Sequence, residues 1–496
     1  MSDIRTTSTE LGEVSIPINF DSSDGEAHRL KGRIGLFELL CTVLAYCAPV
    51  AVVSGYVPFV IVFDGIGAPA VYALCAVLLL LFTVGFTTMT RYVAKPGAFY
   101  AYITAGLGKS IGLGAAFLAI LGYFLASFSA LPFFGINLKM LVANTLGGPD
   151  ISWYWYALVS WLLCGVLSYL RIDLSAKVLT VAMSLEVIVV LLFDSAVFIH
   201  GGNVGIPFQP WTFHAVSSGA IGVSMLFAVA CFLGFEATAV FRDEVKDAKR
   251  TVPLASYIAV LLIGVFYAMS AWALVAAFGV DHVVAVANKD PAGMFATAMT
   301  RYVSKAASDA ARLLVVTSIF AAALSGQNII ARYLFNLGAD KVLPAVLGRV
   351  HDKHQSPFVA ALLVSAIWLV MLVGVAVSGA DPAVTYGCVA GVGAFAIVIL
   401  MTLTSVAVVV FFRRSTHIQD SSRWHTFIAP AVASVGLAVI LVLAVKNFAL
   451  LIGGLDTMSE LMQALVWITF VSGVLLARLY KATRPKIYAR IGGQQV

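Results

Sequence analysis

The stretch FAVACFLGFEATAVFRDEVKDAKRTVP, residues 227–253, decides which class of protein this chain represents. Its first half is apolar enough to lie in lipid, yet it carries Gly234 and Glu236 and then changes abruptly to charged residues and Pro253. A charged carboxyl group at the centre of a bilayer costs about 2.5–3.5 kcal/mol on insertion scales. Because a plain hydrophobic helix needs neither residue, we expect this membrane helix to be interrupted near Gly234.

The composition of the whole chain is that of an integral membrane protein. Of the 496 residues, 61% are hydrophobic and 11% are charged, whereas soluble domains carry about 25% charged residues. A helix needs about 20 mostly apolar residues to cross the hydrocarbon core, where no water can satisfy the backbone. The pattern predicts an all-α fold with twelve spans, at residues 36–62, 70–90, 111–138, 153–170, 176–199, 217–241, 254–279, 311–335, 358–378, 384–412, 426–446 and 461–480.

These spans divide the chain into four parts. Residues 1–33 form a polar tail, 34–415 a ten-helix core, 416–480 two further helices and 481–496 a second tail. The first 30 residues lack an apolar stretch, so we expect no cleaved signal peptide. The first span then directs insertion itself.

The lysines and arginines indicate the orientation. Loops that stay in the cytoplasm collect these residues, and an N-terminus inside would place 25 of the 31 on the cytoplasmic side. We therefore expect a multi-pass protein of the cytoplasmic membrane, surrounded by lipid, with both termini cytoplasmic. The net charge of +6 follows from this topology, and no motif indicates a nucleic-acid partner.

The first predicted span contains a second set of helix-breaking residues. Its sequence VLAYCAPVAVVSGYVPFVIVF, residues 43–63, includes Pro49, Ser54, Gly55 and Pro58. Proline removes an internal hydrogen bond and glycine tolerates non-helical dihedral angles. Interrupted segments at corresponding positions of two halves indicate a transporter site, so we predict a five-plus-five inverted repeat with broken helices 1 and 6. For the two prolines a plain kink is the alternative.

Two such interruptions suit a dipolar solute. They expose N–H groups at one half-helix end and C=O groups at the other, with the helix dipoles reinforcing both. A carboxylate can meet the amides and an ammonium group the carbonyls. Small or aliphatic residues such as Val52, Ala230 and Leu233 dominate these stretches, which favours a neutral amino acid. An organic amine or polyamine is the alternative, and its charge would need a carboxylate partner.

Three motifs resemble the amino acid–polyamine–organocation (APC) superfamily, in the order that this family has. They are KPGAFYAYITAGLG at 95–108, GFEATAVFRDEVKDAKRTVP at 234–253 and LSGQNIIARYLFNLGADKVLP at 324–344. The resemblance covers about residues 30–480. The chain departs from it at Ala98, Ala248 and Lys341, where glycine, proline and glycine are typical, and at AVVSG (51–55), which replaces a Gly-Ser-Gly motif.

The resemblance implies an amino acid permease with the five-plus-five fold and two additional helices. It also implies a substrate held midway between the first and sixth spans. Carried over residue by residue, the substrate site consists of Pro49, Val50, Ala51, Val52, Val53, Ser54, Gly55, Cys231, Phe232, Leu233 and Gly234, faced by Tyr123, Ser127 and Ala323. For Tyr123 an ordinary packed aromatic is the alternative.

Uphill transport needs a second ion or an exchanged solute that biases the same conformational equilibrium. Glu186, Asp194 and Glu236 are the acids deepest in apolar sequence, and each is a conceivable proton carrier. Each acid also has a purely structural interpretation. Glu186 can form a neutral hydrogen bond between helices, Asp194 can lie near the outer interface, and Glu236 can cap the amides at the break and hold it open. The resemblance adds a sodium site between spans one and eight, for which Ser325 is available. Our coupling candidates are Glu236, Glu186 and Ser325, with protons, sodium or exchange as the driving partner.

Other classes of membrane protein lack support in the sequence. An enzyme should show a catalytic constellation, a channel charged or carbonyl-rich filter rings, and a sensor an extra soluble domain, and none of these is recognisable. The six cysteines lie in apolar spans without CxxC spacing. We therefore predict a secondary transporter working by alternating access, with no cofactor and no metal site. The oligomeric state stays open.

Overall fold

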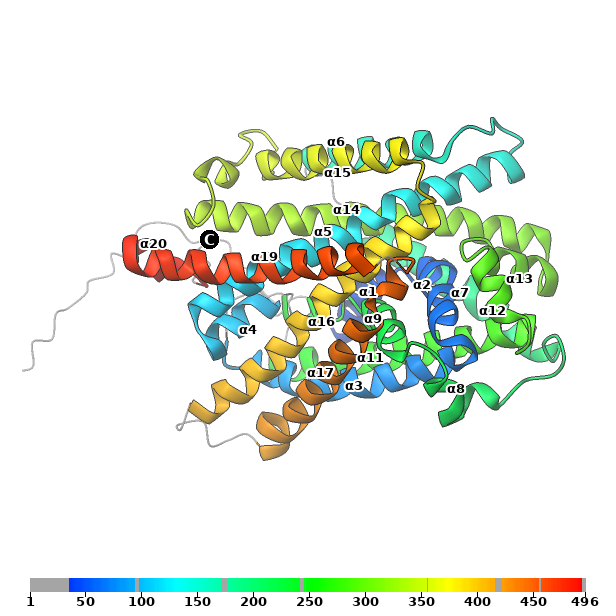
Figure 1. The fold of residues 1–496 in the computed structure, drawn as a ribbon, viewed down its shortest axis with the longest axis horizontal. Coiled ribbons are helices and arrows are strands. Elements are labelled where there is room, and N and C mark those ends of the chain that lie inside the picture. Colours follow the sequence, from blue (N-terminus) through cyan, green and yellow to red (C-terminus); the bar gives the residue numbers. More distant parts are fainter. Residues whose placement is uncertain are drawn as a thin grey trace, which may run out of the picture.

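The computed structural model describes residues 35–93, 98–170, 176–240, 245, 247–354, 356–414, 422–454 and 456–492. Throughout these residues the regular structure is helical, and no strand occurs. Ten of the helical stretches are long and apolar enough to cross a membrane. The protein is therefore an all-helical, multi-pass membrane protein (Figure 1).

The helices follow one another along the chain, with short 3-10 or π-helical turns labelled η. In order they are α1 (Leu36–Tyr46), α2 (Pro49–Asp64), η1 (Gly65–Gly67), α3 (Ala68–Met89), α4 (Ala98–Leu107), α5 (Lys109–Met140), η2 (Leu141–Thr145), α6 (Trp153–Leu170), α7 (Ala176–Ile199), η3 (Gln209–Trp211), α8 (Phe213–Ser217), α9 (Ile221–Ala230), α10 (Ala237–Val240), α11 (Ala248–Phe278), α12 (Val283–Lys289), α13 (Met294–Tyr302), α14 (Lys305–Ala339), η5 (Ala345–Gly348), α15 (Phe358–Ser378), α16 (Pro382–Arg414), η6 (Trp424–Ile428), α17 (Ala429–Lys446), α18 (Phe448–Leu451), α19 (Asp456–Thr483) and α20 (Pro485–Arg490).

Each of the twelve predicted apolar stretches is mostly helical, but only ten candidate spans result. There are two reasons for the difference. The elements α2, η1 and α3 join into one run of 41 residues, Pro49–Met89. In addition, α9 ends after 10 residues, which is too short to cross the membrane alone.

Helix α5 lies at the centre of the bundle and packs against α4, α6, α14, α16 and α19 (Figure 1). Small residues allow these backbones to approach one another closely, as is common where membrane helices pack. A Cβ atom on Gly473 of α19 would come 2.7 Å from the Cα atom of Gly114 of α5. Helices α6 and α15 pack together along one edge of the bundle.

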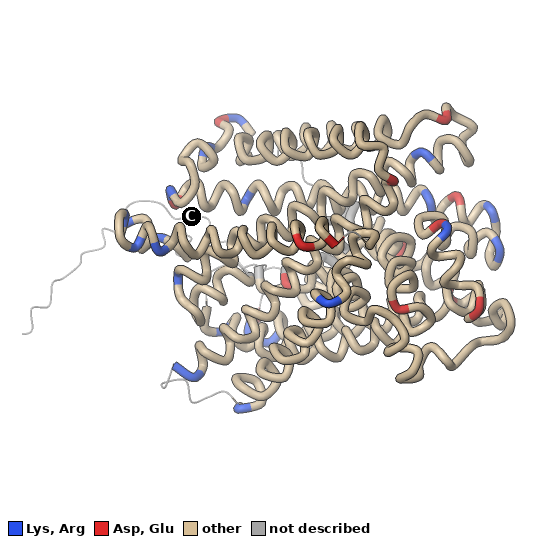
Figure 2. The backbone as a smooth tube through the Cα atoms, viewed as in Figure 1, with Lys and Arg blue, Asp and Glu red and all other residues tan. Residues whose placement is uncertain are grey.

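The outside of the bundle is apolar, as a lipid solvent requires. Large aliphatic side chains such as Ile188 of α7, Val370 of α15 and Ile468 of α19 are 58%, 71% and 66% exposed. Lysines and arginines gather near the two ends of the long helices, whose middle parts carry few charges (Figure 2). The exposed apolar surface is therefore the face toward lipid.

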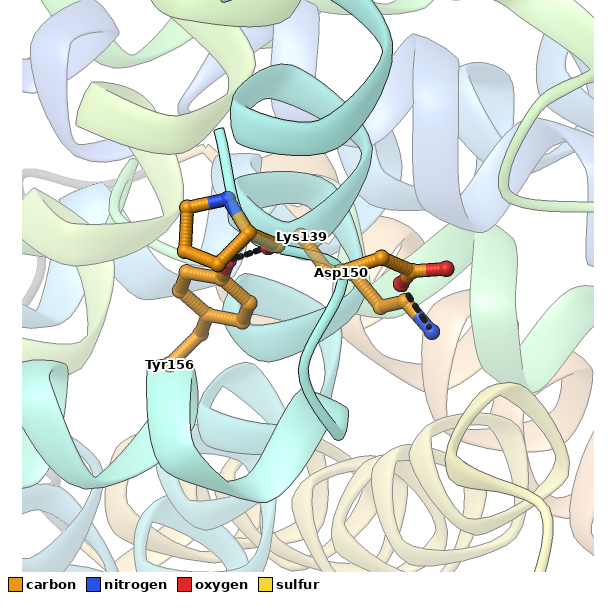
Figure 3. Close-up of polar contacts among 4 residues, drawn as sticks. Lys139, Asp150 and Tyr156 are labelled. Carbon is orange, nitrogen blue, oxygen red and sulfur yellow. Dashed lines mark hydrogen bonds and ion pairs between the residues drawn. The ribbon is translucent and has the colours of Figure 1, made fainter. Parts of the chain in front are cut away.

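The connection between η2 and α6 is held by two polar contacts (Figure 3). Lys139 forms an ion pair of 3.0 Å with Asp150, and the hydroxyl group of Tyr156 donates a hydrogen bond of 2.6 Å to the carbonyl oxygen of Pro149. Exposed ion pairs of this kind contribute little to stability. The half-buried tyrosine contact is the better anchor for this loop.

The C-terminal segment after α19 is docked on the bundle. Ile491 is 1% exposed and packs in one apolar cluster with residues of α4, α5 and α14. The N–H group of Gly492 donates a hydrogen bond of 2.6 Å to the hydroxyl oxygen of Tyr100 in α4, and Lys109 Nζ donates to the carbonyl oxygen of Ala489. Burial raises the pKa of Tyr100 to about 12, so this hydroxyl group stays neutral.

Candidate functional site

The first interruption separates α1 from α2 at Cys47 and Ala48. Ala48 has φ 44° and ψ 63°, the left-handed conformation that L residues rarely adopt. Pro49 explains the position. A residue before proline is disfavoured in helical geometry, and proline, which lacks an N–H group, fits the first position of a new helix.

This interruption lies earlier in the chain than the sequence pattern indicates. We expected Pro49, Ser54, Gly55 and Pro58 to be candidates for unwinding. Pro49 begins α2 directly after the break, but the other three lie inside the continuous helix α2. Proline alone does not unwind a helix when the neighbouring helices hold the backbone. The expected register of the break, at 51–55, is therefore wrong by at least three residues.

The second interruption separates α9 from α10 between Cys231 and Glu236. This segment forms successive tight turns, in which the N–H groups of Phe232, Leu233 and Phe235 donate to carbonyls three residues earlier. Gly234 has φ 114°, a conformation that strains any residue with a Cβ atom. The glycine that drew attention in the sequence therefore lies at the turn that separates the two half-helices.

The two interruptions meet in space. Cys47 Sγ lies 3.6 Å from the carbonyl oxygen of Leu233, within hydrogen-bonding distance for a thiol. The hydroxyl group of Tyr267 in α11 donates a hydrogen bond of 2.9 Å to the carbonyl oxygen of Cys47. On the other side, the hydroxyl group of Tyr72 in α3 lies 3.5 Å from Cys231 Sγ. The thiols of Cys47 and Cys231 are thus polar partners at the two breaks.

Glu236 caps the second interruption. Its Oε2 accepts a hydrogen bond of 2.8 Å from the N–H group of Gly234, and its Oε1 accepts one of 2.8 Å from the hydroxyl group of Tyr123 in α5. The ring of Tyr123 lies 6.2 Å, between centroids, from that of Tyr333 in α14. The carboxyl group, which is 6% exposed, therefore has a donor on each oxygen.

Glu186 of α7 likewise accepts hydrogen bonds at the first interruption. Its Oε2 accepts hydrogen bonds from the N–H group of Val50, at 3.2 Å, and from the hydroxyl group of Ser318 in α14, at 2.9 Å. One carboxyl group thereby joins α7, the first turn of α2, and α14. Ser318 was not among the residues predicted for this site, whereas the predicted sodium candidate Ser325 lies two turns later on the same helix.

An aromatic layer covers α2 beyond the first break. The rings of Phe133 in α5 and Tyr386 in α16 stack with centroids 4.3 Å apart. They press on Gly55, where a Cβ atom would come 2.6 Å from the hydroxyl oxygen of Tyr386. Gly55 thus serves close packing, and not an unwound backbone. The hydroxyl group of Ser54 beside it is buried and has no hydrogen-bond partner among the described residues.

Of the other predicted site residues, some lie at the breaks and others pack between neighbouring helices. Pro49, Val50, Ala51, Val52 and Val53 are all buried in the first turns of α2. Cys231 and Phe232 are buried, and Leu233 is half-buried. Ser127 of α5 packs against Gly326 of α14, whereas Ala323 belongs to a cluster with Cys164 of α6. Ser127 and Ala323 thus have helix-packing contacts of their own.

The electrostatics of the region is set by carboxyl groups. The buried charged residues in the described part of the chain are Asp64, Glu186, Asp194 and Glu236, without a buried lysine, arginine or histidine. Asp194 Oδ2 accepts a hydrogen bond of 2.9 Å from Ser270. Across the same residues no group of histidine, cysteine, aspartate and glutamate side chains could hold a metal ion. The two breaks are therefore polar turns between helices, each capped by a buried glutamate.

Comparison with known proteins extends this description. The profile of the amino acid permease family matches residues 39–485. The chain is 23% identical over 355 residues to the low-affinity putrescine importer PlaP of Escherichia coli, an alignment that covers 69% of this chain and 75% of that protein. It is 25% identical over 361 residues to the branched-chain amino acid permease BcaP of Bacillus subtilis, covering 67% and 72%. Since the family profile spans nearly all of the helical bundle, the chain belongs to the amino acid permease family and is a membrane transporter, not an enzyme.

Proposed function

We propose that this permease is a secondary active transporter that moves a neutral amino acid across the cytoplasmic membrane by alternating access. The observation that carries the proposal is the meeting of two interrupted helices at Cys47 and Leu233. Backbone without helical bonding is tolerated inside a membrane protein where it lines a binding cavity. The substrate then lies between α1–α2 on one side and α9–α10 on the other.

The proposed architecture is a five-plus-five inverted repeat of residues 34–415 followed by two further helices in 416–480. In this scheme α1 with α2 forms the first span and α9 with α10 the sixth, which gives twelve spans. Both termini, 1–33 and 481–496, then face the cytoplasm. The positive-inside distribution of lysine and arginine supports this orientation, and the similar design of the two breaks, each capped by one glutamate, supports the pairing.

The proposed substrate site follows the sequence prediction, centred on Pro49–Gly55 and Cys231–Gly234 with Tyr123, Ser127 and Ala323 nearby. Both oxygens of Glu236 already receive donors from the protein, so this acid is not free to pair with a cationic substrate. The apolar side chains of α2 and α9 around the breaks suit an uncharged side chain. The branched-chain substrate in the name of BcaP agrees with this choice.

For coupling we propose protons or solute exchange, with Glu186 and Glu236 as the first candidates. Each carboxyl group bridges a break to a neighbouring helix, so a change in its charge would alter the contacts of a half-helix. Ser325 of α14 remains the candidate for a sodium-coupled symporter, the alternative mechanism. A ligand or ion can shift such an equilibrium only by its difference in affinity for the two states.

A second candidate function is transport of an organic amine or polyamine. Two observations favour it: the name of PlaP and the presence of two carboxyl groups, those of Glu186 and Glu236, at the two breaks. A diamine would have to draw these groups away from their present donors. That exchange of partners is costly for buried charges, which is why we place it second.

Uptake into proteoliposomes tests these proposals together. Purified protein is supplied with labelled branched-chain and other neutral amino acids, and with labelled putrescine, under an imposed proton gradient, a sodium gradient or preloaded unlabelled solute. We expect neutral amino acids to be taken up and to compete with one another, and putrescine to compete poorly. Uptake of putrescine alone, without competition from amino acids, would replace the first candidate by the second.

A further inference from the structure

Asp64, the last residue of α2, stands apart from the other buried acids in the described part of the chain. Glu236, Glu186 and Asp194 each accept at least one hydrogen bond. Asp64 is 1% exposed, and neither Oδ1 nor Oδ2 has a hydrogen-bond partner among the described residues. A buried carboxylate without donors is among the costliest arrangements in a protein.

The carboxyl group of Asp64 lies near a backbone carbonyl oxygen, and no donor among the described residues bonds to it. A Cβ atom on Gly67 would come 2.5 Å from Asp64 Oδ2 and 2.6 Å from the carbonyl oxygen of Ala215 in α8, so both oxygens lie against the same glycine. The C-terminal end of α2 adds the negative end of a helix dipole. A charged carboxylate is therefore repelled here, whereas a neutral carboxyl group can donate its O–H to a carbonyl oxygen.

Among the described residues no lysine, arginine or histidine forms an ion pair with Asp64. The turn η1 packs against α3, α8, α12 and η3. Of these, α8 carries His214 and α12 carries Lys289, both exposed, whereas α3 and η3 have no charged residue or histidine. Arg301 of α13 and Arg312 of α14, on two other helices packed against α2, form no ion pair with Asp64.

Asp64 also lies where the two interrupted helices are joined. The N–H group of Ala220, directly before α9, donates a hydrogen bond of 2.8 Å to the carbonyl oxygen of Phe63. A Cβ atom on Gly219 would come 2.5 Å from the Cα atom of Asp64. The end of α2 and the start of α9 thus touch backbone to backbone, away from the breaks themselves.

We propose that Asp64 is a proton-binding residue: it carries a proton while α2 is docked on the segment 215–220, and loss of that proton weakens the docking. The proposal rests on the proposed transport function, because it assumes that α2 and α9 change their packing in the cycle. The proton comes from the aqueous side on which the α2–α3 turn lies and returns to it, so no other reactant is needed. Proton concentration on that side then biases the conformational equilibrium.

The first test is spectroscopic and does not need transport. Infrared spectra of the wild type, Asp64→Asn and, as the matched control, Asp281→Asn are compared in lipid nanodiscs at neutral pH. Asp281 is an exposed acid directly before α12. We expect the wild type and the control to share a C=O band of a protonated carboxyl group that Asp64→Asn lacks. Identical bands in all three proteins would overturn the proposal.

A second measurement keeps the test decisive if Asp64→Asn does not fold. Wild-type protein made with aspartate carrying a carbon-13 carboxyl group should show the band shifted by the isotope, which assigns it to an aspartate. A band that does not shift belongs to glutamate and contradicts the proposal. Because Asp194 is the other buried aspartate in the described residues, Asp194→Asn should leave the shifted band in place.

Transport then separates this inference from the function on which it rests. Exchange of labelled against unlabelled substrate at equal pH should occur in the wild type, Asp64→Asn and Asp281→Asn alike. A single titrating proton changes an equilibrium constant by at most about tenfold per pH unit. The pH dependence of uptake should therefore be weaker, by up to this factor, in Asp64→Asn, and should be unchanged in Asp281→Asn. Absence of exchange in all three would instead refute the transport proposal. A wild-type rate that follows sodium and not pH would overturn the proposal that a proton on Asp64 biases the equilibrium.

Discussion

The hydroxyl group of Tyr123 donates a 2.8 Å hydrogen bond to Oε1 of Glu236 and so ties α5 to the turn that separates α9 from α10. Removing the hydroxyl leaves one buried carboxylate oxygen without a donor, which costs about 1–3 kcal/mol. We expect Tyr123→Phe to lower the thermal unfolding midpoint and to slow uptake. Tyr333→Phe, which keeps the neighbouring ring in place, is the control, and equal midpoints for the two variants would contradict the role of this bond.

Gly234 should tolerate no side chain. Its φ of 114° makes a residue with a Cβ atom cost about 1–3 kcal/mol in strain, and a bulky side chain would also fill the space between the breaks. We expect Gly234→Leu to remain folded in the membrane but to abolish uptake. Gly374→Leu in α15, where a Cβ atom would meet no neighbour within 4 Å, should transport normally. Wild-type flux in Gly234→Leu would argue against a substrate site at the turn.

Glu186 offers a way to separate capping from coupling. Glu186→Gln retains an oxygen that can accept from the N–H group of Val50, so the fold should survive, whereas Glu186→Ala leaves that donor unpaired and should destabilise the protein by about 1–3 kcal/mol. If Glu186 carries the coupling proton, Glu186→Gln exchanges substrate across liposomes but no longer accumulates it under a proton gradient. Ser318→Ala removes only the second donor and should keep accumulation, which makes it the control.

Cys47 reports on the site directly, since its thiol lies at the first break and is 4% exposed. In a variant whose other cysteines are replaced, labelling of Cys47 by a membrane-permeant maleimide should require opening of the site and should slow when substrate is present. A matched variant that retains only Cys164 of α6 should react at a rate independent of substrate. Equal substrate protection of both thiols would point to a general tightening of the protein.

The contact between Ser127 and Gly326 allows the packing of α5 against α14 to be tested with a double mutant. A Cβ atom on Gly326 would overlap the hydroxyl group of Ser127, and overpacking of this kind costs about 1–3 kcal/mol. We expect Gly326→Ala to lower the unfolding midpoint and the additional change Ser127→Gly to restore it. A double variant no more stable than Gly326→Ala alone would show that the clash lies elsewhere.

The sequence predicted the helices well, because hydrophobic length is dictated by the bilayer and not by details of packing. It also located the second break, since Gly234 and Glu236 are both anomalous in an apolar helix. The first break was expected too late in the chain because Ser54, Gly55 and Pro58 resemble helix breakers as Pro49 does, whereas the left-handed residue is Ala48, directly before Pro49. Gly55 is small for another reason, the stack of Phe133 on Tyr386, which comes from helices far away in the sequence.

The side-chain partners of the breaks could not have been read from one sequence. Glu186 was recognised as a buried acid, but its contact with Ser318 depends on how α7 and α14 cross. Tyr267 and Tyr72 carry no signal in the sequence, and their role follows from their contacts with Cys47 and Cys231. Asp64 was overlooked because it lies between two predicted spans, where an acid is expected to be solvated.

The docked segment after α19 covers part of the surface of the bundle. Ile491 and Gly492 follow α19 in the chain and contact residues of α4, α5 and α14, far earlier in the sequence. A variant truncated after Arg490 would uncover this apolar patch and leave the hydroxyl group of Tyr100 without the Gly492 donor, so the stability of the bundle depends in part on a segment outside its spans.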